Sequence, residues 1–397
     1  MAQTVYDFDA VIDRHNTSSL KYDFAKERKG REDLLPLWVA DMDFALPQEI
    51  LEDIKARADH GIFGYTDPKP DYMQAIIRWY RRHHQWEIGQ EQITVMPGVV
   101  YAIACAIRAF TGPGDAVIIQ QPVYYPFYET IVDNHRKCIN SQLIYEDGRY
   151  RMDYEDFEQK IIENQVRLFL LCNPHNPVGR VWTREELQRI GEICIRHNVI
   201  IFADEIHGDF TYPGYHYTPF ASISEEFARH TVVGTSPSKT FNLAGLQAAN
   251  IVVPDETLRR QLWQENAAAG YSQANTLGLV ACQSAYEKGE EWHAQLLRYL
   301  TGNLDYVRTF LKERIPQIQL VEPEGTYLVW LDCRKLTDNH KDLEHLIVEE
   351  AKLWLDPGAI FGRETKLFER INIACPRATL EQALQQLEAA VQARLSQ

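Results

Sequence analysis

Short apolar segments alternate with amphipathic helical segments through the middle of the chain, and this alternation restricts the possible folds more than any other feature. Segments rich in β-branched residues have the length of strands, and several are continuously apolar, as strands buried on both faces are; they are residues 92–95, 116–119, 166–171, 199–203 and 231–233. Helical patterns such as 100–110 and 185–197 lie between them, the second preceded by a capping box of Thr183 and Glu186. The alternation predicts an α/β fold in which a mostly parallel sheet lies between helices.

The pattern changes after about residue 285, where a second unit is expected. A long polar helical segment, 290–314, precedes two segments that alternate like half-exposed strands, 326–332 and 370–374, and a final helix covers residues 380 to about 395. A chain of 397 residues has room for two domains. We therefore expect a large α/β domain at residues 46–285 and a smaller α+β domain formed by residues 1–45 together with 286–397.

The charge of the chain argues against nucleic-acid binding. The 41 lysine and arginine residues are outnumbered by 56 acidic residues, so the formal net charge is −15 and the surface repels phosphate backbones. The densest basic stretch, residues 78–84, lies within one amphipathic helical pattern and forms no basic stripe. We expect no nucleic-acid partner.

Hydropathy and cysteine spacing indicate the compartment. The longest apolar runs are only as long as strands, and the N-terminus has early acidic residues and no apolar core of a signal sequence. The seven cysteines are widely spread and form no C-x-x-C motif, as expected of reduced thiols in the cytoplasm. These features predict a cytoplasmic protein that neither spans nor binds a membrane, and an acidic soluble enzyme remains open.

Polar residues follow several of the predicted strands, at the edge of an open α/β sheet where ligands bind. After residues 92–95, a turn at Gly98 opens a helix whose first amides, at Val99 and Val100, could bind a phosphate, although such a turn is more often an ordinary connection. After residues 166–171, two Asn-Pro pairs form a rigid loop that could hold the amide of Asn176 at the strand tip. Asn-Pro is also common in simple turns.

Two ionisable residues follow the next strands. Asp204 ends a buried strand, where it either caps a helix or keeps a ring nitrogen protonated, because a buried acid needs a cationic or hydrogen-bonding partner. Lys239 follows residues 231–233 within a run of hydroxyl residues, so that Ser236 and Ser238 could bind a phosphate while the amine reaches a carbonyl carbon. Apolar walls and cationic neighbours would lower the pKa of this lysine and make it a Schiff-base nucleophile.

The order of these signals is more specific than any one of them. A glycine turn, an aromatic loop, the Asn-Pro loop, a strand-end Asp, Ser-x-Ser-Lys and a late arginine match what pyridoxal phosphate needs, namely a Schiff-base lysine, a carboxylate for the pyridinium nitrogen and a phosphate cup. The motifs H-E-x-x-H and G-x-S-x-G are absent, so metal and triad chemistry are less well supported.

On these residues the chain resembles the fold-type-I pyridoxal-phosphate enzymes of the class I/II aminotransferase-like superfamily, and within it the MalY/PatB-type cystathionine β-lyases, or C–S lyases. The most specific runs are WVADMDF at 38–44 and RINIACPR at 370–377. Further matches are FGY at 63–65, PGVV at 97–100, QPVY at 121–124, NPHNPVG at 173–179, ADEIH at 203–207, SPSKTFN at 236–242 and PEGTY at 323–327. The resemblance covers nearly the whole chain and implies the superfamily fold, a large domain with a mostly parallel sheet of seven strands between helices plus a smaller α+β domain.

The resemblance implies a role for each candidate residue. Lys239 would bind the cofactor covalently, Asp204 would pair with the pyridine nitrogen, and Tyr124 would lie over the ring. The other implied cofactor contacts are Asn176 at the ring hydroxyl, the amides of Gly98, Val99 and Val100, the hydroxyls of Ser236 and Ser238, His207, and Tyr65 from the neighbouring subunit of a homodimer with shared active sites. Arg370 would bind the substrate carboxylate, with Ala40 and Asn176 also at the substrate and Arg377 as the alternative clamp.

Two positions depart from many aminotransferases. Gln247 stands where a phosphate-binding arginine is common eight residues after the lysine, and His207 stands where many have a tyrosine. Both departures fit the lyase subfamily. With Lys239, Arg370 and Arg377 near a phosphate and a carboxylate, the predicted pocket is locally cationic.

The implied reaction is β-elimination from L-cystathionine or a related L-cysteine S-conjugate, with Lys239 removing the Cα proton and a thiol, pyruvate and ammonia as products. An aminotransferase would use the same cofactor residues and differs only in its products. A third hypothesis adds a regulatory protein-binding role to the lyase. The physiological S-conjugate is not defined by the sequence.

Overall fold

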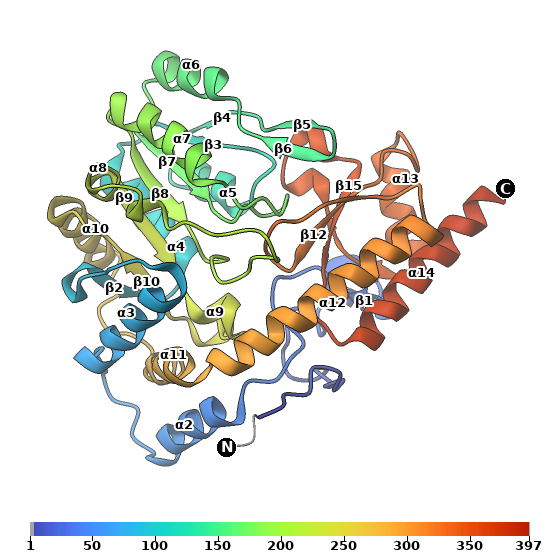
Figure 1. The fold of residues 1–397 in the computed structure, drawn as a ribbon, viewed down its shortest axis with the longest axis horizontal. Helices are drawn as coiled ribbons and strands as arrows, with labels where there is room; N and C mark the ends of the chain where they lie inside the picture. Colours follow the sequence, from blue (N-terminus) through green and yellow to red (C-terminus); the bar gives the residue numbers. More distant parts are fainter. Residues whose placement is uncertain (1–3, 397) are drawn as a thin grey trace.

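The computed structural model describes residues 4–396 and contains a seven-stranded sheet at its centre (Figure 1). In order across the sheet the strands are β2 (Ile93–Met96), β10 (Ala249–Val252), β9 (Thr231–Thr235), β8 (Ile200–Asp204), β7 (Leu168–Cys172), β3 (Ala116–Ile119) and β4 (Lys137–Asn140). All neighbours are parallel except β10, which is antiparallel to both of its partners. The predicted mostly parallel sheet is confirmed, and β4 and β10 are additional to the five strands expected from the sequence.

Helices cover both faces of this sheet because alternate strand residues point to opposite sides. In β7, Leu168 and Leu170 pack in one core cluster with α4 (Val99–Phe110), α5 (Pro126–Asp133) and α10 (Glu256–Ala268). Phe169 and Leu171 pack in another cluster with α6 (Tyr154–Asn164), α7 (Arg184–Arg196) and α8 (Glu225–Arg229). Two further helices, α3 (Pro70–His84) and α11 (Thr276–Lys288), close the side of the sheet near β2 and β10. The apolar runs are therefore buried on both faces, as their composition predicts.

Helix α7 begins where the sequence predicts it to begin. The hydroxyl of Thr183 accepts a hydrogen bond from the amide of Glu186 at 3.2 Å, and the carboxylate of Glu186 accepts one from the amide of Thr183 at 2.9 Å. This reciprocal pair is the expected capping box, and it satisfies two amides that the helix itself leaves without partners.

The C-terminal part forms a second sheet beside a long helix, α12 (Glu290–Arg314). The strands lie in the order β11 (Gln319–Val321), β12 (Leu328–Asp332), β15 (Phe368–Asn372) and β14 (Asp356–Pro357), all antiparallel. Helix α13 (His340–His345) follows β12, and α14 (Arg377–Leu395) closes the chain beside α12. The predicted helix at 290–314 and the final helix are confirmed.

One expectation about this sheet is wrong, since β12 and β15 are buried along their whole length and are not half-exposed. Val329 and Ile371 pack in the same cluster as residues of α12 and α14. On the other face, Trp330 stacks on Phe368 at 5.3 Å, and its indole donates to the hydroxyl of Tyr150 at 3.3 Å. Apolar and polar residues alternate in these strands because the two faces of the sheet are buried in different surroundings. One face packs on α12 and α14, and the other faces the domain that contains the seven-stranded sheet.

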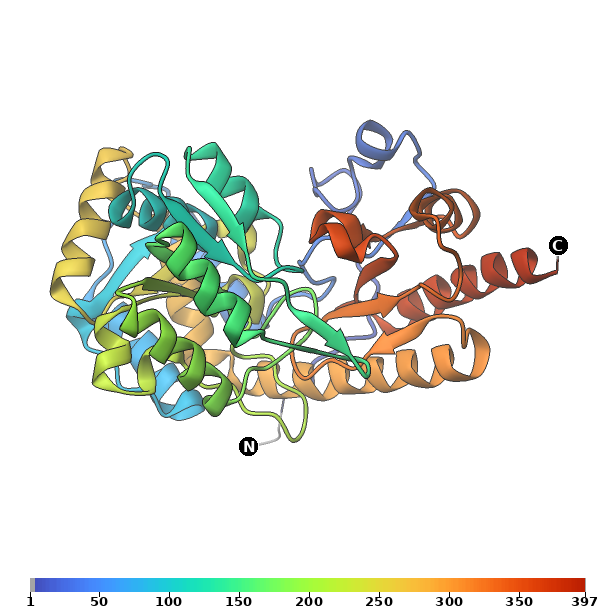
Figure 2. The ribbon, with the colours of Figure 1, turned by 90° about the horizontal axis from the view of Figure 1, so that it is seen from above.

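The N-terminal arm packs on the C-terminal part of the chain. Strand β1 (Leu35–Pro36) pairs in parallel with β13 (Leu353–Trp354), and Trp38 stacks on Trp354 with ring centroids 4.5 Å apart. Figure 2 shows the N-terminal segment beside the segments that end the chain. This contact fits the proposed grouping of residues 1–45 with 286–397, whereas the boundaries at residues 45 and 285 stay predictions.

The described helices and ion pairs agree with the expectation that there is neither a membrane-spanning helix nor a basic stripe in residues 4–396. Within residues 4–396, every helix is too short or too polar to cross a bilayer. The basic stretch at 78–84 lies in α3, where Arg78 pairs with Glu287 at 3.1 Å and Arg82 with Glu290 at 3.0 Å. Its charge is therefore balanced by acidic residues from α11 and α12.

Candidate active site

A cavity of about 210 Å³ opens at the carboxyl ends of β7, β8 and β9, where an open α/β sheet binds its ligands. Candidate residues from six separate segments line it: Ala40, Gly98, Val99, Val100, Tyr124, Asn176, Asp204, His207, Ser236, Ser238 and Lys239. Sheet topology brings most of these segments together, because most of the residues follow strands that end at the same edge.

Lys239 lies in α9 (Pro237–Thr240), the short helix that follows β9, and its amine donates a 2.7 Å hydrogen bond to the carbonyl of Ala40. Burial lowers the pKa of Lys239 to about 8, aided by the cation of Arg370 and opposed by the carboxylates of Asp41 and Asp204. A lysine with a pKa lowered in this way has a far larger neutral fraction near physiological pH than an ordinary lysine, and the neutral amine can act as a nucleophile or a base.

Asp204 is the last residue of β8 and is 5% exposed. Burial raises the pKa of this carboxyl to about 7, although the amide of Ile206 donates to it at 3.2 Å and the nearby Lys239 favours its charged form. A buried carboxylate with so little compensation gains most from a cationic partner, such as a protonated ring nitrogen placed in the cavity.

Another part of the cavity lining suits an anion. Gly98 caps α4, so the first amides of this 12-residue helix, including those of Val99 and Val100, have no partner within the helix. The hydroxyl of Ser236 accepts from the amide of Ser238 at 3.1 Å and donates to the carbonyl of Ala248 at 2.7 Å, which shapes the turn before Lys239.

Arg370 lies behind the cavity and is 2% exposed. Its guanidinium donates to Oδ1 of Asn176 at 2.8 Å and to the carbonyl of Trp38 at 3.0 Å, and it pairs with Asp356, which lies opposite Arg370 in the β14–β15 register. Its Nε is buried and has no partner among the described residues. A buried donor without a partner costs free energy, so a carboxylate that reached it beside Asn176 would be stabilised there.

Arg377, the alternative clamp, lies elsewhere. Its Nε donates to Asn303 of α12 at 2.9 Å, and its guanidinium lies 4.8 Å from the ring centroid of Tyr306. The geometry therefore favours Arg370 as the residue that meets a substrate carboxylate.

The expectation of a locally cationic pocket is wrong. Asp41, Asp204 and Asp356 lie close enough to Lys239 or Arg370 to change their electrostatic surroundings. The site is a set of opposed charges. The sequence predicted Asp204 at this site, but nothing in the pattern placed Asp41 and Asp356 beside Lys239 and Arg370.

Two of the predicted site residues contribute neutral rings to the cavity. Burial lowers the pKa of His207 well below its usual value, and its Nδ1 is buried without a partner in the described part of the chain. Burial also raises the pKa of Tyr124, so its hydroxyl stays protonated. Both rings can donate or accept hydrogen bonds without bringing charge to the cavity.

Tyr65 does not lie in this cavity. Its side chain is 96% exposed, on a loop where Ile62 and Phe63 are also exposed. Its expected role at the site of a neighbouring subunit stays a prediction.

The sequence reasoning missed three residues that contact the site residues. The hydroxyl of Tyr327 donates to the Ala40 carbonyl at 3.0 Å, Asp356 pairs with Arg370, and Asn372 donates to the carbonyls on both sides of Ala40. Tyr327 and Asn372 lie within the specific PEGTY and RINIACPR runs, which could have indicated them. No motif marks Asp356.

Comparison with known proteins agrees with this geometry. Residues 32–387 match the family described as aminotransferase class I and II. Cystathionine beta-lyase PatB of Bacillus subtilis (strain 168) is 41% identical over 384 residues, which cover 97% of this chain and 99% of PatB. Protein MalY of Escherichia coli (strain K12) is 32% identical over 391 residues, covering 98% of this chain and 100% of MalY.

A solved structure is similar over the same length. Cystalysin from Treponema denticola, whose crystal structure contains a pyridoxal 5′-phosphate cofactor, gives a TM-score of 0.95 at 37% identity, with 98% of this chain and 100% of cystalysin covered. With a family match over most of its length and near-complete similarity to PatB and MalY, the chain belongs to the class I and II aminotransferase family and, within it, to the branch of the PatB- and MalY-type cystathionine β-lyases.

Proposed function

We propose that the protein is a pyridoxal-phosphate-dependent C–S β-lyase that converts L-cystathionine and related L-cysteine S-conjugates to a thiol, pyruvate and ammonia. From cystathionine the thiol is homocysteine. The observation that carries the proposal is the amine of Lys239, whose pKa is lowered to about 8, which lines one cavity with Asp204 and is influenced by the charge of Arg370. The names of the relatives PatB and cystalysin support the cofactor and the reaction class.

The cavity fits this cofactor on the chemistry of its donor set. Asp204 is a buried acid short of a cationic partner, the amides that open α4 suit a phosphate, and the unpartnered Nδ1 of His207 and the amide of Asn176 are available to a ring hydroxyl. When bound, pyridoxal phosphate supplies a conjugated ring that accepts the electron pair left at the substrate Cα.

The residues of the chain then divide the work. Arg370 binds the substrate α-carboxylate, and Asn176, which accepts from this arginine at 2.8 Å, fixes the plane of the guanidinium. Asp204 holds a proton at the ring nitrogen. The neutral amine of Lys239 removes the Cα proton, after which the bond between Cβ and sulfur breaks and the thiolate leaves with the electron pair. Water then hydrolyses the released three-carbon enamine to pyruvate and ammonia.

Product identification tests the proposal. Purified protein incubated with cystathionine should release pyruvate and a thiol in equal amounts, and Lys239→Ala should release neither. Lys335→Ala changes an exposed lysine that does not line the cavity. It is the matched control and should behave as wild type. Transfer of the amino group to a keto acid without thiol release would contradict the lyase reaction and identify an aminotransferase. Binding of a regulatory partner would survive in Lys239→Ala.

We also propose a homodimer and a cytoplasmic location. The exposed apolar loop of Ile62, Phe63 and Tyr65 suits burial against a second copy, since large apolar groups are seldom left together in water. All seven cysteines are free thiols, which suits a reducing compartment. Sedimentation analysis should give twice the mass of 46.0 kDa for the assembled protein.

A further inference from the structure

The irregular segment at residues 38–42 is held by side chains at every carbonyl. It belongs to no helix or strand, so its backbone groups have no ladder to pair with. Five successive carbonyls nevertheless accept side-chain hydrogen bonds: Trp38 from Arg370, Val39 from Asn372, Ala40 from Lys239 and Tyr327, Asp41 from Asn372 and Lys21, and Met42 from Asn242 and Arg14. Such complete satisfaction fixes the direction of each carbonyl.

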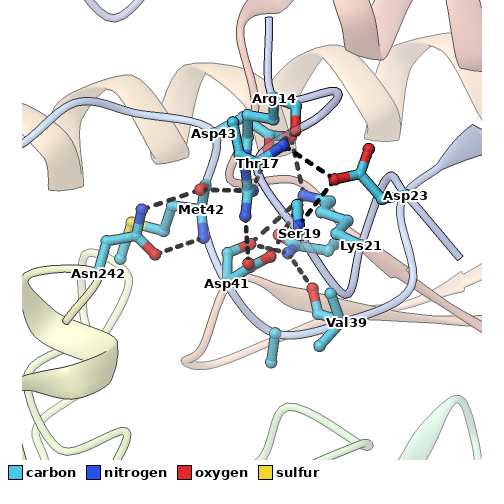
Figure 3. A network of polar contacts seen from close by, with 12 residues as sticks. Arg14, Thr17, Ser19, Lys21, Asp23, Val39, Asp41, Met42, Asp43 and Asn242 are labelled. Carbon is cyan, nitrogen blue, oxygen red and sulfur yellow. Dashed lines mark hydrogen bonds and ion pairs between the residues drawn. The ribbon is translucent and has the colours of Figure 1, made fainter. Parts of the chain in front are cut away.

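The N-terminal arm contributes two cations to this segment, a fully buried Lys21 and a partly buried Arg14 (Figure 3). Arg14 pairs with Asp41 at 2.6 Å and with Asp43 at 2.7 Å. Lys21 is fully buried and pairs with Asp43 at 2.8 Å. Buried ion pairs are often no more stabilising than apolar residues of similar size, because the charges lose their hydration. Stability alone is therefore a weak reason for this arrangement, and a role in geometry is a better one.

Asn372 holds the segment from the other side. Its side-chain amide donates to the carbonyl of Val39 at 2.8 Å and to that of Asp41 at 2.7 Å, so it spans the Ala40 peptide. It lies two residues after Arg370 on β15 and therefore on the same face of the strand. One strand thus positions both the carboxylate clamp and the backbone that meets Lys239.

We propose that Arg14, Lys21 and Asn372 are positioning residues, which hold the Ala40 carbonyl as the acceptor that keeps the free Lys239 amine in place for proton transfer. The proposal rests on the proposed function, since only an enzyme that frees this amine during its reaction needs to hold it. It explains why an arm that begins more than 200 residues before Lys239 reaches the catalytic centre.

The charged groups around the amine determine how each substitution acts. Three charged groups influence the pKa of Lys239: Asp41 in the segment 38–42, Asp204 at the end of β8 and Arg370 on β15. The other titratable neighbours are His207, Tyr327 and Tyr124. Arg14 offsets the charge of Asp41. Removal of Arg14 increases the negative electrostatic potential at Lys239 and should favour the protonated amine. Removal of the neutral Asn372 should displace the Ala40 carbonyl and the Lys239 amine without changing the potential at the amine.

The experiment compares Arg14→Met, Arg14→Lys and Asn372→Ala in the holoenzyme, with Arg31→Met as the matched control. Arg31 lies in the same arm and forms two ion pairs, but its partners are Asp33 and Glu349, both outside the held segment. Readouts are kcat and KM for cystathionine, the melting temperature, and the pH midpoint of the visible absorption change of the lysine-bound cofactor.

We expect kcat to fall about tenfold or more in Arg14→Met and Asn372→Ala while KM changes less than about twofold, because misplacement of a catalytic group slows the chemical step. The spectral midpoint should rise by roughly half a unit to one unit in Arg14→Met, return toward wild type in Arg14→Lys and stay unchanged in Asn372→Ala and Arg31→Met.

A lower melting temperature with unchanged kcat and midpoint in both Arg14→Met and Asn372→Ala would overturn the proposal and leave these residues a structural role. If Arg14→Met does not fold, Asn372→Ala and Arg14→Lys still decide between the two. If wild-type protein releases no pyruvate, the proposed reaction fails, and the spectral midpoint of Arg14→Met then still tests whether Arg14 controls the charge near Lys239.

Discussion

Asp204→Asn should stabilise the cofactor-free protein at pH 8 while it removes activity. The substitution keeps the shape of the side chain and the oxygen that accepts from the amide of Ile206, and it removes only the charge. Because burial raises the pKa of Asp204 to about 7, the folded protein without cofactor binds this proton more tightly than the unfolded chain does.

The sign and size of the effect follow from proton linkage. An acid whose folded pKa lies above its unfolded value near 3.8 contributes its full stability below that value, and the contribution is lost as the pH rises through about 7. Each pKa unit corresponds to about 1.4 kcal/mol, so Asp204 costs the fold about 4 kcal/mol at pH 8 and about 1.5 kcal/mol at pH 5. The neutral amide of the variant carries neither cost.

Urea unfolding of cofactor-free wild type and Asp204→Asn at both pH values measures the difference. The variant should be more stable by a margin that grows by about 2 to 3 kcal/mol from pH 5 to pH 8. Glu205 also has a pKa raised by burial, to about 8, but it is present in both proteins, so most of its own titration cancels. The exposed Asp338→Asn serves as the control and should show no such growth.

With the cofactor bound, the wild type should be more stable than Asp204→Asn. A protonated ring nitrogen compensates the charge of Asp204 in the wild type, whereas the variant loses at least about a hundredfold in pyruvate release. A stability difference that does not depend on pH would refute the reasoning that Asp204 is an uncompensated buried charge.

Three other changes test separate parts of the structure. Arg370→Lys should lower kcat/KM for cystathionine at least about tenfold, because an ammonium group cannot reproduce the fixed plane of the guanidinium; steady-state kinetics checks this. Thr183→Ala should lower the free energy of unfolding by about 1 kcal/mol through loss of the α7 cap, measured in urea. Co-expressed Tyr65→Ala and Lys239→Ala subunits, each inactive alone, should regain activity if Tyr65 acts in the partner's site, and no recovery would contradict that role.

The large unit was predictable because its signals are local. Residues 116–119 form a strand with the expected bounds, and Thr183 and Glu186 form the expected cap, since both depend on neighbours within a few residues. The edge strand β4 has a partly polar sequence, and the antiparallel β10 interrupts the expected parallel order. Pairing with the adjacent strand decides both, and local pattern does not contain that information.

The candidate site was predictable to the extent that its residues follow strands. Asp204 and Lys239 meet because β8 and β9 are parallel neighbours that end at the same edge. The partners of Arg14 and the burial of Lys21 were not predictable, because charged residues near an N-terminus usually lie in solvent and nothing local indicates their contacts. Only the tertiary packing of the N-terminal arm places them beside Asp41 and Asp43.

The ion pair between Arg370 and Asp356 changes what carboxylate binding requires. A guanidinium that already has a carboxylate partner gains less Coulomb energy from a second one, so charge alone gives the substrate little affinity. Three partners, Asp356, Asn176 and the carbonyl of Trp38, instead fix the plane of the guanidinium, and the buried Nε has no partner among the described residues. We therefore expect carboxylate recognition to depend on where the carboxylate can be placed, and we expect this geometric demand to turn the Cα–H bond of an α-amino acid toward the amine of Lys239.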